Sequence, residues 1–389
     1  MKERLRIGFA SIEDANSISS WSGIPMNILN VLQKRPDLEV ELISPMGQML
    51  KHLFVIPKLY GKWTHRAYDW KREDLCLRRF AHQIETAVRD RKLDVVFSTS
   101  SIPGTRLDVS IPFVFWTDAT FHGMDGYYTS LFLERTRRLG RRQEEAALLR
   151  ATFSCFASEW AASGARRFAD PDRVKVLPLG PNLPVTHTDA DIARWTTQRR
   201  HERPTRCSLL FIGVGWERKG GAIALETARH LNESGIATTL RVVGSEVPGP
   251  VPSYVESLGF INKREPEGQR RLIDLYRSSD IFILPSRAEA FGVVVSEAAA
   301  FGLPALVTDT GGLSETVRDG KTGFRIPLQD KGTLFAEKAR TIMESYEIYS
   351  RNAYSEFKNR LNWETSVDHL AFLLQRAVQN NPKRAEAKS

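Results

Sequence analysis

The sequence predicts an α/β protein made of two doubly wound domains, each a parallel sheet covered by helices on both sides. Short β-branched and aromatic runs alternate along the chain with longer segments of helical periodicity. Several runs, such as DVVF and DIFIL, are apolar at successive positions, as expected of strands buried on both faces. A length of 389 residues suits two domains better than one.

The expected elements form two series separated by a polar segment. Residues 184–206 are charged, bounded by prolines and without a strand pattern, which is typical of a linker. The first series has strands at 5–10, 94–99, 112–117, 152–157 and 174–178, and helices at 74–91 and 127–150. The second has strands at 208–213, 239–244, 280–285 and 305–308, and helices at 219–234, 268–278, 292–301 and 330–347. We therefore predict domains at 1–185 and 205–365, a linker at 186–204 and a C-terminal segment at 366–389.

Charge and cysteine content narrow the class of partners and the compartment. The formal charge of +9 favours anionic partners such as nucleotides, phosphorylated sugars or anionic lipids. No apolar run approaches the ~20 residues that a membrane-spanning helix needs, and the N-terminus has the pattern of a first strand rather than of a signal peptide. Cys76, Cys155 and Cys207 are far apart and support neither a disulfide framework nor a zinc site. We expect a cytoplasmic protein.

A glycine-rich loop, FIGVGWERKGG, follows the first strand of the second series and leads into a helix. Glycines such as Gly215 permit a tight turn and a close backbone approach. The N-terminus of the next helix presents N–H groups and the positive end of its dipole to an anion. With Arg218 and Lys219 beside it, the loop predicts a diphosphate site. It is not a P-loop, because Gly221 stands where the lysine would be. A purely structural joint with two solvated cations is the alternative.

A second loop carries two acidic residues eight positions apart. Glu289 lies in the loop, Gly292 permits a close approach, and Glu297 lies on the helix that follows. The N–H groups of Phe291, Gly292 and Val293 open that helix and suit a phosphate. Carboxylates accept charge-assisted hydrogen bonds from sugar hydroxyls. The alternative is a helix whose acids only complement its own dipole.

Glu289 and Glu297 fit the E-x7-E pattern, and the chain here resembles the retaining glycosyltransferases of family 4. These enzymes have the GT-B fold, in which two Rossmann-like domains face each other across a cleft. The resemblance continues through 298–305, 310–315 and 319–323. It is dense over 205–370 and weaker over 1–185. Residues 362–364 (Asn-Trp-Glu) resemble the start of the family's C-terminal helix, which crosses back to the first domain.

The resemblance implies a nucleotide-diphosphate-sugar donor bound mainly by the second domain, with no metal or other cofactor. Arg218 and Lys219 would neutralise the diphosphate leaving group, and Glu289 would hydrogen-bond to the sugar hydroxyls. Glu297 would hold the ribose. A donor phosphate oxygen would take the acceptor proton in a front-face attack, so that the protein supplies positioning and charge stabilisation. The remaining donor contacts would come from Gly215, Phe260, Ile261, Phe291, Gly292 and Val293.

The first domain is expected to hold the acceptor, which is a glycan, a lipid-linked group or a small molecule. Ser22 and Gly23 lie in SWSGIP, which resembles the family's glycine-rich N-terminal loop, although the family usually has two adjacent glycines there. Many relatives place a functional histidine after the third strand. Here Asp118 takes that position as a catalytic candidate that accepts a hydrogen bond from a hydroxyl, and His122 lies four residues on. A merely packed His122 fits equally well.

Two basic segments and two D-x-D patterns complete the candidates. Residues 51–72 mix basic and aromatic side chains, and 134–142 hold five arginines. Such segments suit an anionic lipid surface or a lipid-linked acceptor, which would place the protein peripherally at the inner membrane face. Solvated helix faces explain them equally well, and no motif supports nucleic-acid binding. The D-x-D patterns at 170–172 and 189–191 fall in a turn and in the linker, so we assign no metal.

The sequence therefore predicts a retaining, metal-independent glycosyltransferase in glycan, polysaccharide or glycolipid synthesis. Three alternatives stay open: a GT-B nucleotide-sugar epimerase, a GT-B phosphorylase, and a non-catalytic subunit that binds nucleotide sugars. The donor base, the sugar and the acceptor are not readable from these residues.

Overall fold

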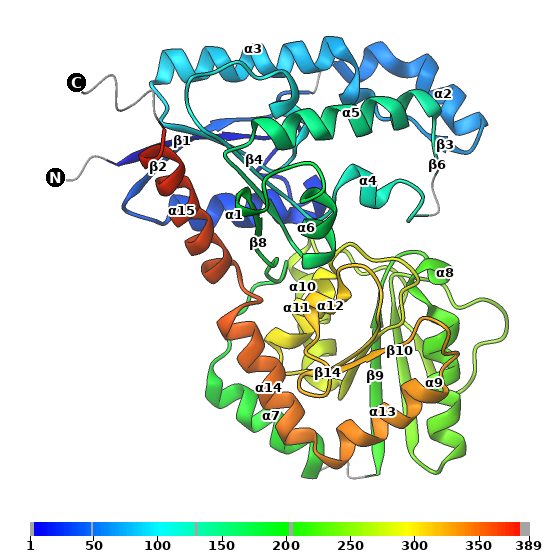
Figure 1. Ribbon diagram of the computed structural model, residues 1–389. Coiled ribbons are helices and arrows are strands. Elements are labelled where there is room, and N and C mark those ends of the chain that lie inside the picture. Colours follow the sequence, from blue (N-terminus) through cyan, green and yellow to red (C-terminus); the bar gives the residue numbers. More distant parts are fainter. Residues whose placement is uncertain (1–3, 48–49, 129–130, 202–204, 382–389) are drawn as a thin grey trace. The chain divides into compact units, whose positions relative to one another are not determined.

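The computed structural model describes residues 4–47, 50–128, 131–201 and 205–381. It divides into two units, each with one six-stranded parallel sheet (Figure 1). Unit 1 comprises Met1–Leu177 and Trp363–Ser389, and unit 2 comprises Pro178–Asn362. The last described helix, α15 (Trp363–Gln379), therefore belongs to unit 1, although the chain before it has built all of unit 2.

Unit 1 has a sheet in the order β2-β1-β4-β5-β7-β8. Its central strands β4 and β5 are buried along almost their whole length, because helices cover both faces. Figure 1 shows α1 and α15 against one face and α3 and α5 against the other. The strands are β1 (Leu5–Ala10), β2 (Leu38–Ile43), β4 (Val95–Ser98), β5 (Phe113–Thr117), β7 (Phe153–Phe156) and β8 (Val174–Val176). The helices are α1 (Ile24–Gln33), α3 (Asp74–Arg91), α4 (Phe121–Met124), α5 (Glu134–Arg150) and α6 (Glu159–Ala165), with short 3-10 turns η1 (Ser20–Gly23), η3 (Trp70–Arg72), η4 (Ile102–Arg106) and η5 (Pro171–Arg173).

After β2, the described residues 44–47 and 50–72 lie outside the main sheet of unit 1. They form η2 (Leu50–Phe54), α2 (Val55–Trp63) and β3 (Arg66–Ala67). Strand β3 pairs with β6 (Leu131–Phe132) in a small two-stranded ladder, separate from the main sheet. The chain then enters α3 and returns to the sheet as β4.

Unit 2 has the strand order β11-β10-β9-β12-β13-β14, the order of a doubly wound nucleotide-binding sheet. Side chains of β9 alternate between two apolar layers: Leu209 and Phe211 face one, and Leu210 faces the other. The strands are β9 (Arg206–Ile212), β10 (Ala237–Val243), β11 (Val255–Ser257), β12 (Ile281–Leu284), β13 (Ala305–Thr308) and β14 (Gly323–Ile326). The helices are α7 (Asp189–His201), α8 (Trp216–Lys219), α9 (Gly221–Glu233), α10 (Pro266–Ser278), α11 (Val293–Ala300), α12 (Leu313–Thr316), α13 (Thr333–Glu344) and α14 (Tyr346–Asn359).

The structure corrects several sequence predictions. Within the predicted linker 186–204, residues 189–201 form α7, which packs in unit 2 through Arg199 on the carbonyls of Tyr276, Arg277 and Phe301; residues 202–204 lie outside the described part. The helix expected at 127–150 starts only at Glu134. The helix expected at 330–347 is two helices, α13 and α14. None of the described helices is long and apolar enough to cross a membrane. The three cysteines are buried, and none of them forms a disulfide in the described part of the chain. Residues 382–389 of the expected C-terminal segment also lie outside the described residues.

Candidate functional site

In unit 2 the loops that follow β9, β12 and β13 meet at one edge of the sheet. These three strands are neighbours in the sheet and parallel, so their carboxyl ends share an edge. Strand order reverses between β9 and β12, and ligands of doubly wound sheets bind at such a reversal. The three loops carry most of the donor residues that the sequence singles out.

Arg218, Lys219 and Glu289 are brought together there from two of the loops. The Glu289 carboxylate forms an ion pair with the Lys219 ammonium, and both side chains are only 11% exposed. Arg218 Nη1 lies 3.8 Å from the same Oε2 and also donates to the Ala288 carbonyl oxygen at 3.3 Å. Ser286 Oγ adds a long 3.5 Å hydrogen bond to Oε2. Two cations thus converge on one nearly dehydrated carboxylate, where their interaction is stronger than at an exposed surface.

Glycines allow these loops to touch. A side-chain carbon on Gly220 would stand 1.9 Å from the carbonyl oxygen of Pro285, and one on Gly312 would stand 1.8 Å from that of Ala290. Gly220 also has a φ of 75°, which disfavours any other residue. The Gly312 N–H donates to the Glu289 carbonyl oxygen at 2.9 Å. The backbone around Glu289 is therefore fixed from both sides.

The helix α11 begins directly behind this cluster. Gly292 is its N-terminal cap in a left-handed conformation. The N–H groups of the first turn, Val293 among them, have no acceptor within the helix. Phe291 is almost fully buried, so its side chain belongs to the core and only its backbone is available to a ligand.

Glu297, one and a half turns further along α11, is buried and already bound. Its carboxylate accepts a hydrogen bond from the Tyr276 hydroxyl at 2.9 Å and from the Asn182 N–H at 3.2 Å. Burial raises the pKa of the Glu297 carboxyl, while the charge of Lys263 and the two hydrogen bonds work against that rise. Sequence reasoning did not connect Tyr276 or Asn182 with Glu297, because each reaches it from a distant segment.

The other donor candidates differ in exposure. Gly215 has a left-handed φ of 91° and no heavy atom close to where a side chain would stand, so this point of the loop is open. Phe260 is strongly exposed, whereas Ile261 is buried in the core of unit 2. Only the Ile261 backbone can therefore serve a ligand.

Unit 1 has a cavity of about 460 Å³ at the equivalent edge of its own sheet. Its floor is formed by the loops after β1, β4 and β5, and the strand order of unit 1 reverses between β1 and β4. Polar side chains dominate the lining. They are Ser11, Glu13, Ser20, Asp69, Lys71, Arg72, Thr99, Ser100, Ser101, Thr117, Asp118 and Glu144.

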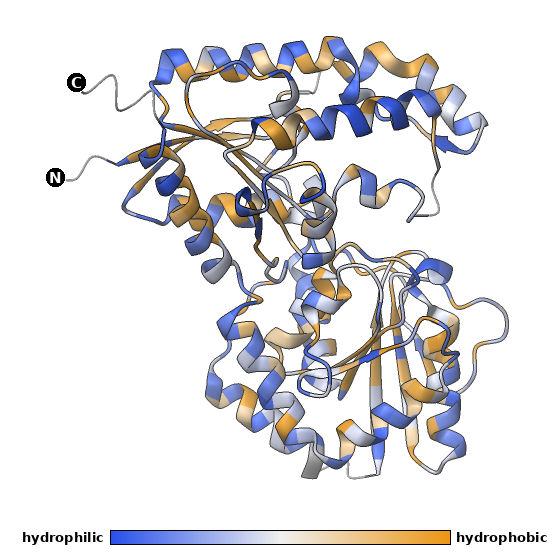
Figure 2. Ribbon diagram, in the orientation of Figure 1, coloured by the Kyte–Doolittle hydropathy of each residue, from blue (hydrophilic) through white to orange (hydrophobic). Residues whose placement is uncertain are grey.

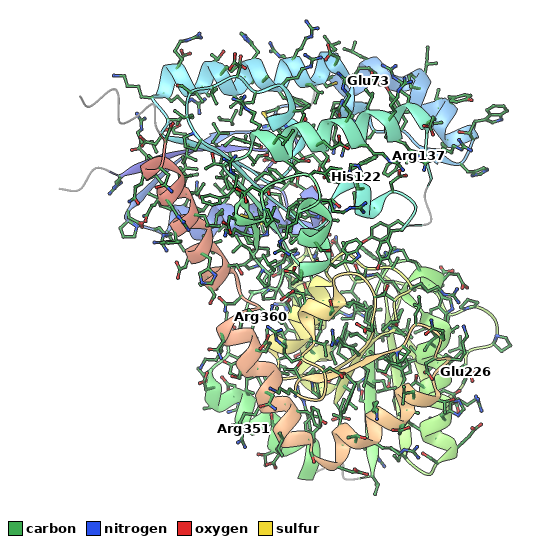
Figure 3. All side chains as sticks on the ribbon, in the orientation of Figure 1. Glu73, His122, Arg137, Glu226, Arg351 and Arg360 are labelled. Atoms are coloured by element: carbon green, nitrogen blue, oxygen red, sulfur yellow. The ribbon has the colours of Figure 1, made fainter. Side chains whose placement is uncertain are left out.

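Asp118 lies in this cavity, as the sequence predicts for the acceptor side. His122 does not line it: on α4 the ring stacks on Phe168 and lies 3.4 Å from a Glu144 carboxylate oxygen (Figure 3). Ser22 and Gly23 do not line it either, although their neighbours Ser20 and Trp21 do. Trp21 and Ser22 have positive φ angles, which strain the backbone of this loop.

Apart from Asp118, sequence reasoning did not predict the charged lining of the cavity, and it placed Lys71 and Arg72 only in the basic segment 51–72. Lys71 pairs with Glu13 at 2.6 Å, and Arg72 pairs with Asp69 at 3.1 Å. Arg72 is buried and its guanidinium carbon lies 4.4 Å from the centre of the Phe121 ring. Asp69, Lys71 and Arg72 lie in or just before η3, whereas Glu13 comes from the loop after β1, so no local motif joins Lys71 to Glu13.

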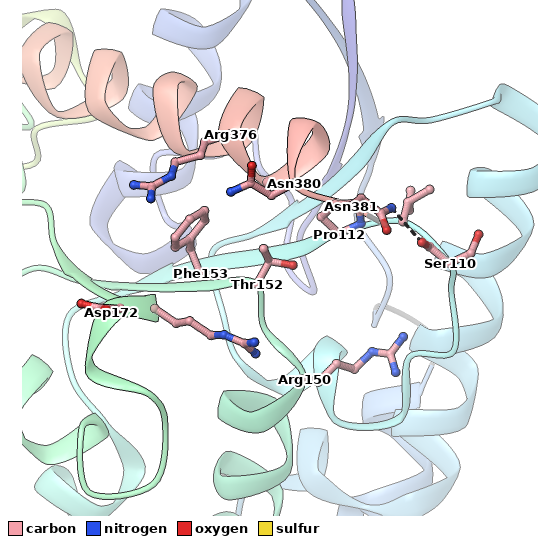
Figure 4. Close-up of a pocket in the computed structure, with 12 residues that line it drawn as sticks. Ser110, Pro112, Arg150, Thr152, Phe153, Asp172, Arg376, Asn380 and Asn381 are labelled. Carbon is pink, nitrogen blue, oxygen red and sulfur yellow. Dashed lines mark hydrogen bonds between the residues drawn. The ribbon is translucent and has the colours of Figure 1, made fainter. Parts of the chain in front are cut away.

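A second hollow of unit 1, of about 410 Å³, lies at the opposite edge of the sheet, beside the end of α15 (Figure 4). Arg150, Arg173 and Arg376 line it, and Asn381 donates to the Ser110 carbonyl oxygen at 3.0 Å. It lies at the amino ends of the strands, where doubly wound sheets do not bind their ligands. We therefore place the candidate site at the carboxyl edges.

The aspartates of the two D-x-D patterns have local partners. Asp170 accepts the N–H of Asp172 in a turn at 2.9 Å. Asp189 binds Lys358 and Tyr354, and Asp191 binds Thr188 and Arg194. In the described part of the chain no three His, Cys, Asp or Glu side chains cluster as metal ligands do.

Comparison with known proteins places the site in context. The model of the family described as "Glycosyl transferases group 1" matches residues 194–360, all within unit 2. A D-inositol 3-phosphate glycosyltransferase of Corynebacterium efficiens is 27% identical over 236 residues, covering 56% of this chain and 55% of the relative. One of Rhodococcus opacus is 32% identical over 231 residues, covering 54% and 50%. The chain thus spans about half the length of the curated relatives it matches.

Solved structures match nearly the whole chain. Sucrose-phosphate synthase from Thermosynechococcus elongatus has a TM-score of 0.66 and 17% identity, covering 96% of this chain and 99% of that one. Anabaena Alr3699/HepE in complex with UDP-glucose has a TM-score of 0.60 and 17% identity, covering 96% and 100%. The fold, two Rossmann-like units, is GT-B.

Proposed function

We propose that this GT-B chain is a glycosyltransferase that moves a sugar from a nucleotide-diphosphate donor to an acceptor hydroxyl. The observation that carries the proposal is the convergence of Arg218, Lys219 and Glu289 at the strand reversal of unit 2. The match of this unit to the group 1 glycosyltransferases and the names of its relatives support it.

In the donor site, the diphosphate would replace Glu289 as the anion bound by Arg218 and Lys219. Before the donor binds, Glu289 neutralises Lys219. An entering diphosphate offers the two cations a new anion, and Glu289 is then released to accept hydrogen bonds from the hydroxyls of the donor sugar. The N-terminus of α11 adds N–H donors and a positive dipole end to the same region. The exposed Phe260 would cover the nucleobase, and Glu297 would receive the ribose hydroxyls with the lone pairs that Tyr276 and Asn182 leave available.

We propose the retaining, metal-independent form of the reaction. The bond from the anomeric carbon to the diphosphate oxygen breaks, and a bond to the acceptor oxygen forms on the same face. The acceptor proton passes to a diphosphate oxygen. The nucleoside diphosphate leaves with the electron pair of the broken bond. Arg218 and Lys219 stabilise the charge that develops on this leaving group, which is the part of the barrier that fixed cations lower most effectively.

The acceptor would bind in the cavity of unit 1, with Asp118 as the hydrogen-bond acceptor for its hydroxyl. Six hydroxyl side chains and both signs of charge line this space, which suits a polyhydroxylated molecule or glycan end. Such an enzyme would serve glycan, polysaccharide or glycolipid synthesis. Inositol 3-phosphate is the acceptor named for the relatives, and it belongs to this chemical class.

A thermal-shift panel of UDP-, GDP- and ADP-sugars without added metal tests the donor site. Ligand that binds the native state raises its stability by mass action, about 2.7 kcal/mol at a hundred times the dissociation constant. We expect one nucleotide to stabilise the protein. Lys219→Met should remove the shift, whereas Lys338→Met, which removes a lysine paired on the far helix α13, should retain it. No shift with any donor, or equal shifts in both variants, would contradict the proposed site.

Transfer itself is measured with the stabilising donor and a panel of sugars, inositols and their phosphates as acceptors. Release of free nucleotide diphosphate only when an acceptor is present supports a transferase. Conversion of the donor sugar with no acceptor would support the epimerase instead.

A further inference from the structure

The short helix α2 of unit 1 turns its apolar side outward. Of the fourteen large apolar side chains that are exposed in the described residues, six lie between 53 and 63. Ile56 is 80% exposed and Trp63 is 77% exposed. At 3.6 residues per turn the five of them on α2 share an arc of about 140°. The six are Leu53, Val55, Ile56, Leu59, Tyr60 and Trp63, which together we call the α2 surface.

The opposite side of α2 is the one that packs on unit 1, and it is small. A side-chain carbon on Gly61 would stand 2.6 Å from the carbonyl oxygen of Arg66, so the helix lies directly against β3. Phe54, just before α2, packs against the core and stacks on Trp70 with ring centres 6.4 Å apart. The helix is thus held by its narrow side. An ordinary surface helix buries its apolar face, whereas α2 exposes its apolar face to solvent.

Positive charge surrounds the α2 surface. Residues 50–68 contain Lys51, Lys58, Lys62 and Arg66 and no acidic residue. Lys58 is folded back over the ring of Trp70 and donates to the Lys51 carbonyl oxygen at 3.0 Å. Figure 2 shows this end of unit 1 as an apolar stretch of α2 next to the strongly hydrophilic α5.

Helix α5 extends the positive field. Strand β3 pairs with β6, and Leu133, the residue before α5, donates its N–H to the Ala67 carbonyl oxygen at 3.0 Å, so the start of α5 lies beside the end of α2. Arg137 and Arg141 are bound to Asp125. Arg138 and Arg142 are exposed and form no ion pair within the part of the chain that the structure describes.

We propose that the α2 surface docks unit 1 onto an anionic lipid bilayer. Its branched and aromatic side chains enter the boundary between headgroups and acyl chains, where Trp63 and Tyr60 place a ring in the apolar layer and a polar group in the wet one. The surrounding lysines and arginines bind the lipid phosphates. A second copy of this chain is a poorer occupant, because it would bring two acid-free basic helices face to face. This inference concerns a surface outside both candidate substrate sites and does not rest on the proposed transfer reaction.

Vesicle sedimentation of the full chain tests the proposal. We expect binding to phosphatidylglycerol vesicles, at least tenfold weaker binding to phosphatidylcholine vesicles, and release from the former as salt is raised. The double variant Ile56→Gln/Trp63→Gln should lose at least tenfold in partition coefficient. Its matched control, Leu149→Gln/Phe372→Gln, removes two similarly exposed apolar side chains of unit 1 from α5 and α15, and should bind like the unchanged protein.

The charge variant Lys51→Gln/Lys62→Gln separates the electrostatic part of the lipid binding from the apolar part. It should weaken binding at low salt and reduce the salt dependence, which the remaining lysines and arginines still sustain. Absence of binding to anionic vesicles, or an equal loss in the control, overturns the proposal. So does a dimer in size-exclusion chromatography that dissociates in Ile56→Gln/Trp63→Gln, since the α2 surface would then be covered by a second copy. Thermal unfolding of the same variants without ligand shows that they are folded, and it does not depend on the proposed donor site.

Discussion

Unit 1 and unit 2 are both six-stranded parallel sheets of the doubly wound type, and they present different chemistry at the edge where the strand order reverses. In unit 2 the loops at the carboxyl edge are locked against each other, with Gly220 and Gly312 leaving no room for a side chain and Lys219 held on Glu289. In unit 1 the corresponding edge holds an open cavity of about 460 Å³ lined by residues from many separate turns. The locked edge of unit 2 is where we propose that the diphosphate binds, and the open cavity of unit 1 is where we propose that the acceptor binds.

The two units also differ after their second strand. In unit 2 the chain continues into β11 and extends the sheet next to β10. In unit 1 the described residues between β2 and α3 lie outside the main sheet and include the exposed α2. Unit 1 thus carries both the open cavity and the surface that we assign to lipid.

The largest effect is expected from Glu289→Gln. The change keeps the shape but removes the charge that neutralises Lys219 and the acceptor for sugar hydroxyls, so transfer should fall by more than about a hundredfold, or about 3 kcal/mol. Affinity for the nucleoside diphosphate should hold or rise, because Lys219 is no longer occupied. Transfer rates and calorimetric binding of the diphosphate measure the two effects.

The matched control for that change is Glu226→Gln, which removes an exposed carboxylate paired with Arg229 on α9. It should leave both quantities unchanged. A Glu289→Gln variant that transfers at the normal rate would remove Glu289 from the site, and one that loses diphosphate affinity would contradict the proposed replacement of Glu289 by the diphosphate.

Gly220→Ala tests how tightly unit 2 is locked. The added carbon would meet the Pro285 carbonyl oxygen at 1.9 Å in a left-handed backbone, so the loops must part, at an expected cost of about 2–3 kcal/mol. Gly235→Ala introduces the same backbone strain with no heavy atom within 4 Å and should cost only about 1 kcal/mol. Urea unfolding compares them, and equal losses would show that the contact with Pro285 relaxes freely.

Unit 2 was predicted better than unit 1, for a physical reason. Its site residues lie in short loops with fixed spacing, so glycines and charges at 213–221 and 289–297 could be read locally. The strands that sequence reasoning missed in the main sheets, β2, β11 and β14, all lie at sheet edges. An edge strand is half exposed and carries charges such as Glu39 and Glu41, which hide its β pattern. Lys71, Arg72 and Glu144 meet only through tertiary packing.

Asp118→Asn tests whether the cavity of unit 1 belongs to the acceptor. Loss of a charged hydrogen-bond acceptor should raise the acceptor KM about tenfold, or about 1.4 kcal/mol, while the thermal shift by the donor nucleotide stays the same. Asp108→Asn, on an exposed loop of the same unit, should change neither. If Asp118→Asn also lost donor binding, Asp118 would belong to the donor site. The proposal that unit 1 binds only the acceptor would then be contradicted.

The smallest expected effect is on the free energy of unfolding. It comes from the buried carboxyl of Glu297 and is measured as a dependence of stability on pH. Burial raises its pKa above the ordinary value of 4.5, so above about pH 4.5 the folded state holds this proton more tightly than the unfolded state does. Its contribution to stability therefore falls as pH rises from 4.5 to the folded pKa and stays constant above it. The fall is about 1.4 kcal/mol for each pH unit that separates the two pKa values. Glu297→Gln does not titrate, so its stability relative to the unchanged protein should improve over the same window.

Tyr276→Phe sharpens this last test. The Tyr276 hydroxyl donates to the ionised carboxylate at 2.9 Å and so favours the charged form. Without it the folded pKa of Glu297 should rise further and the loss of stability with pH should extend to higher pH. Urea midpoints between about pH 4.5 and 8 measure both variants. Parallel curves for the unchanged protein and Glu297→Gln would mean that Lys263 and the two hydrogen bonds offset the burial fully, and that the carboxylate stands ready, ionised, for the ribose hydroxyls.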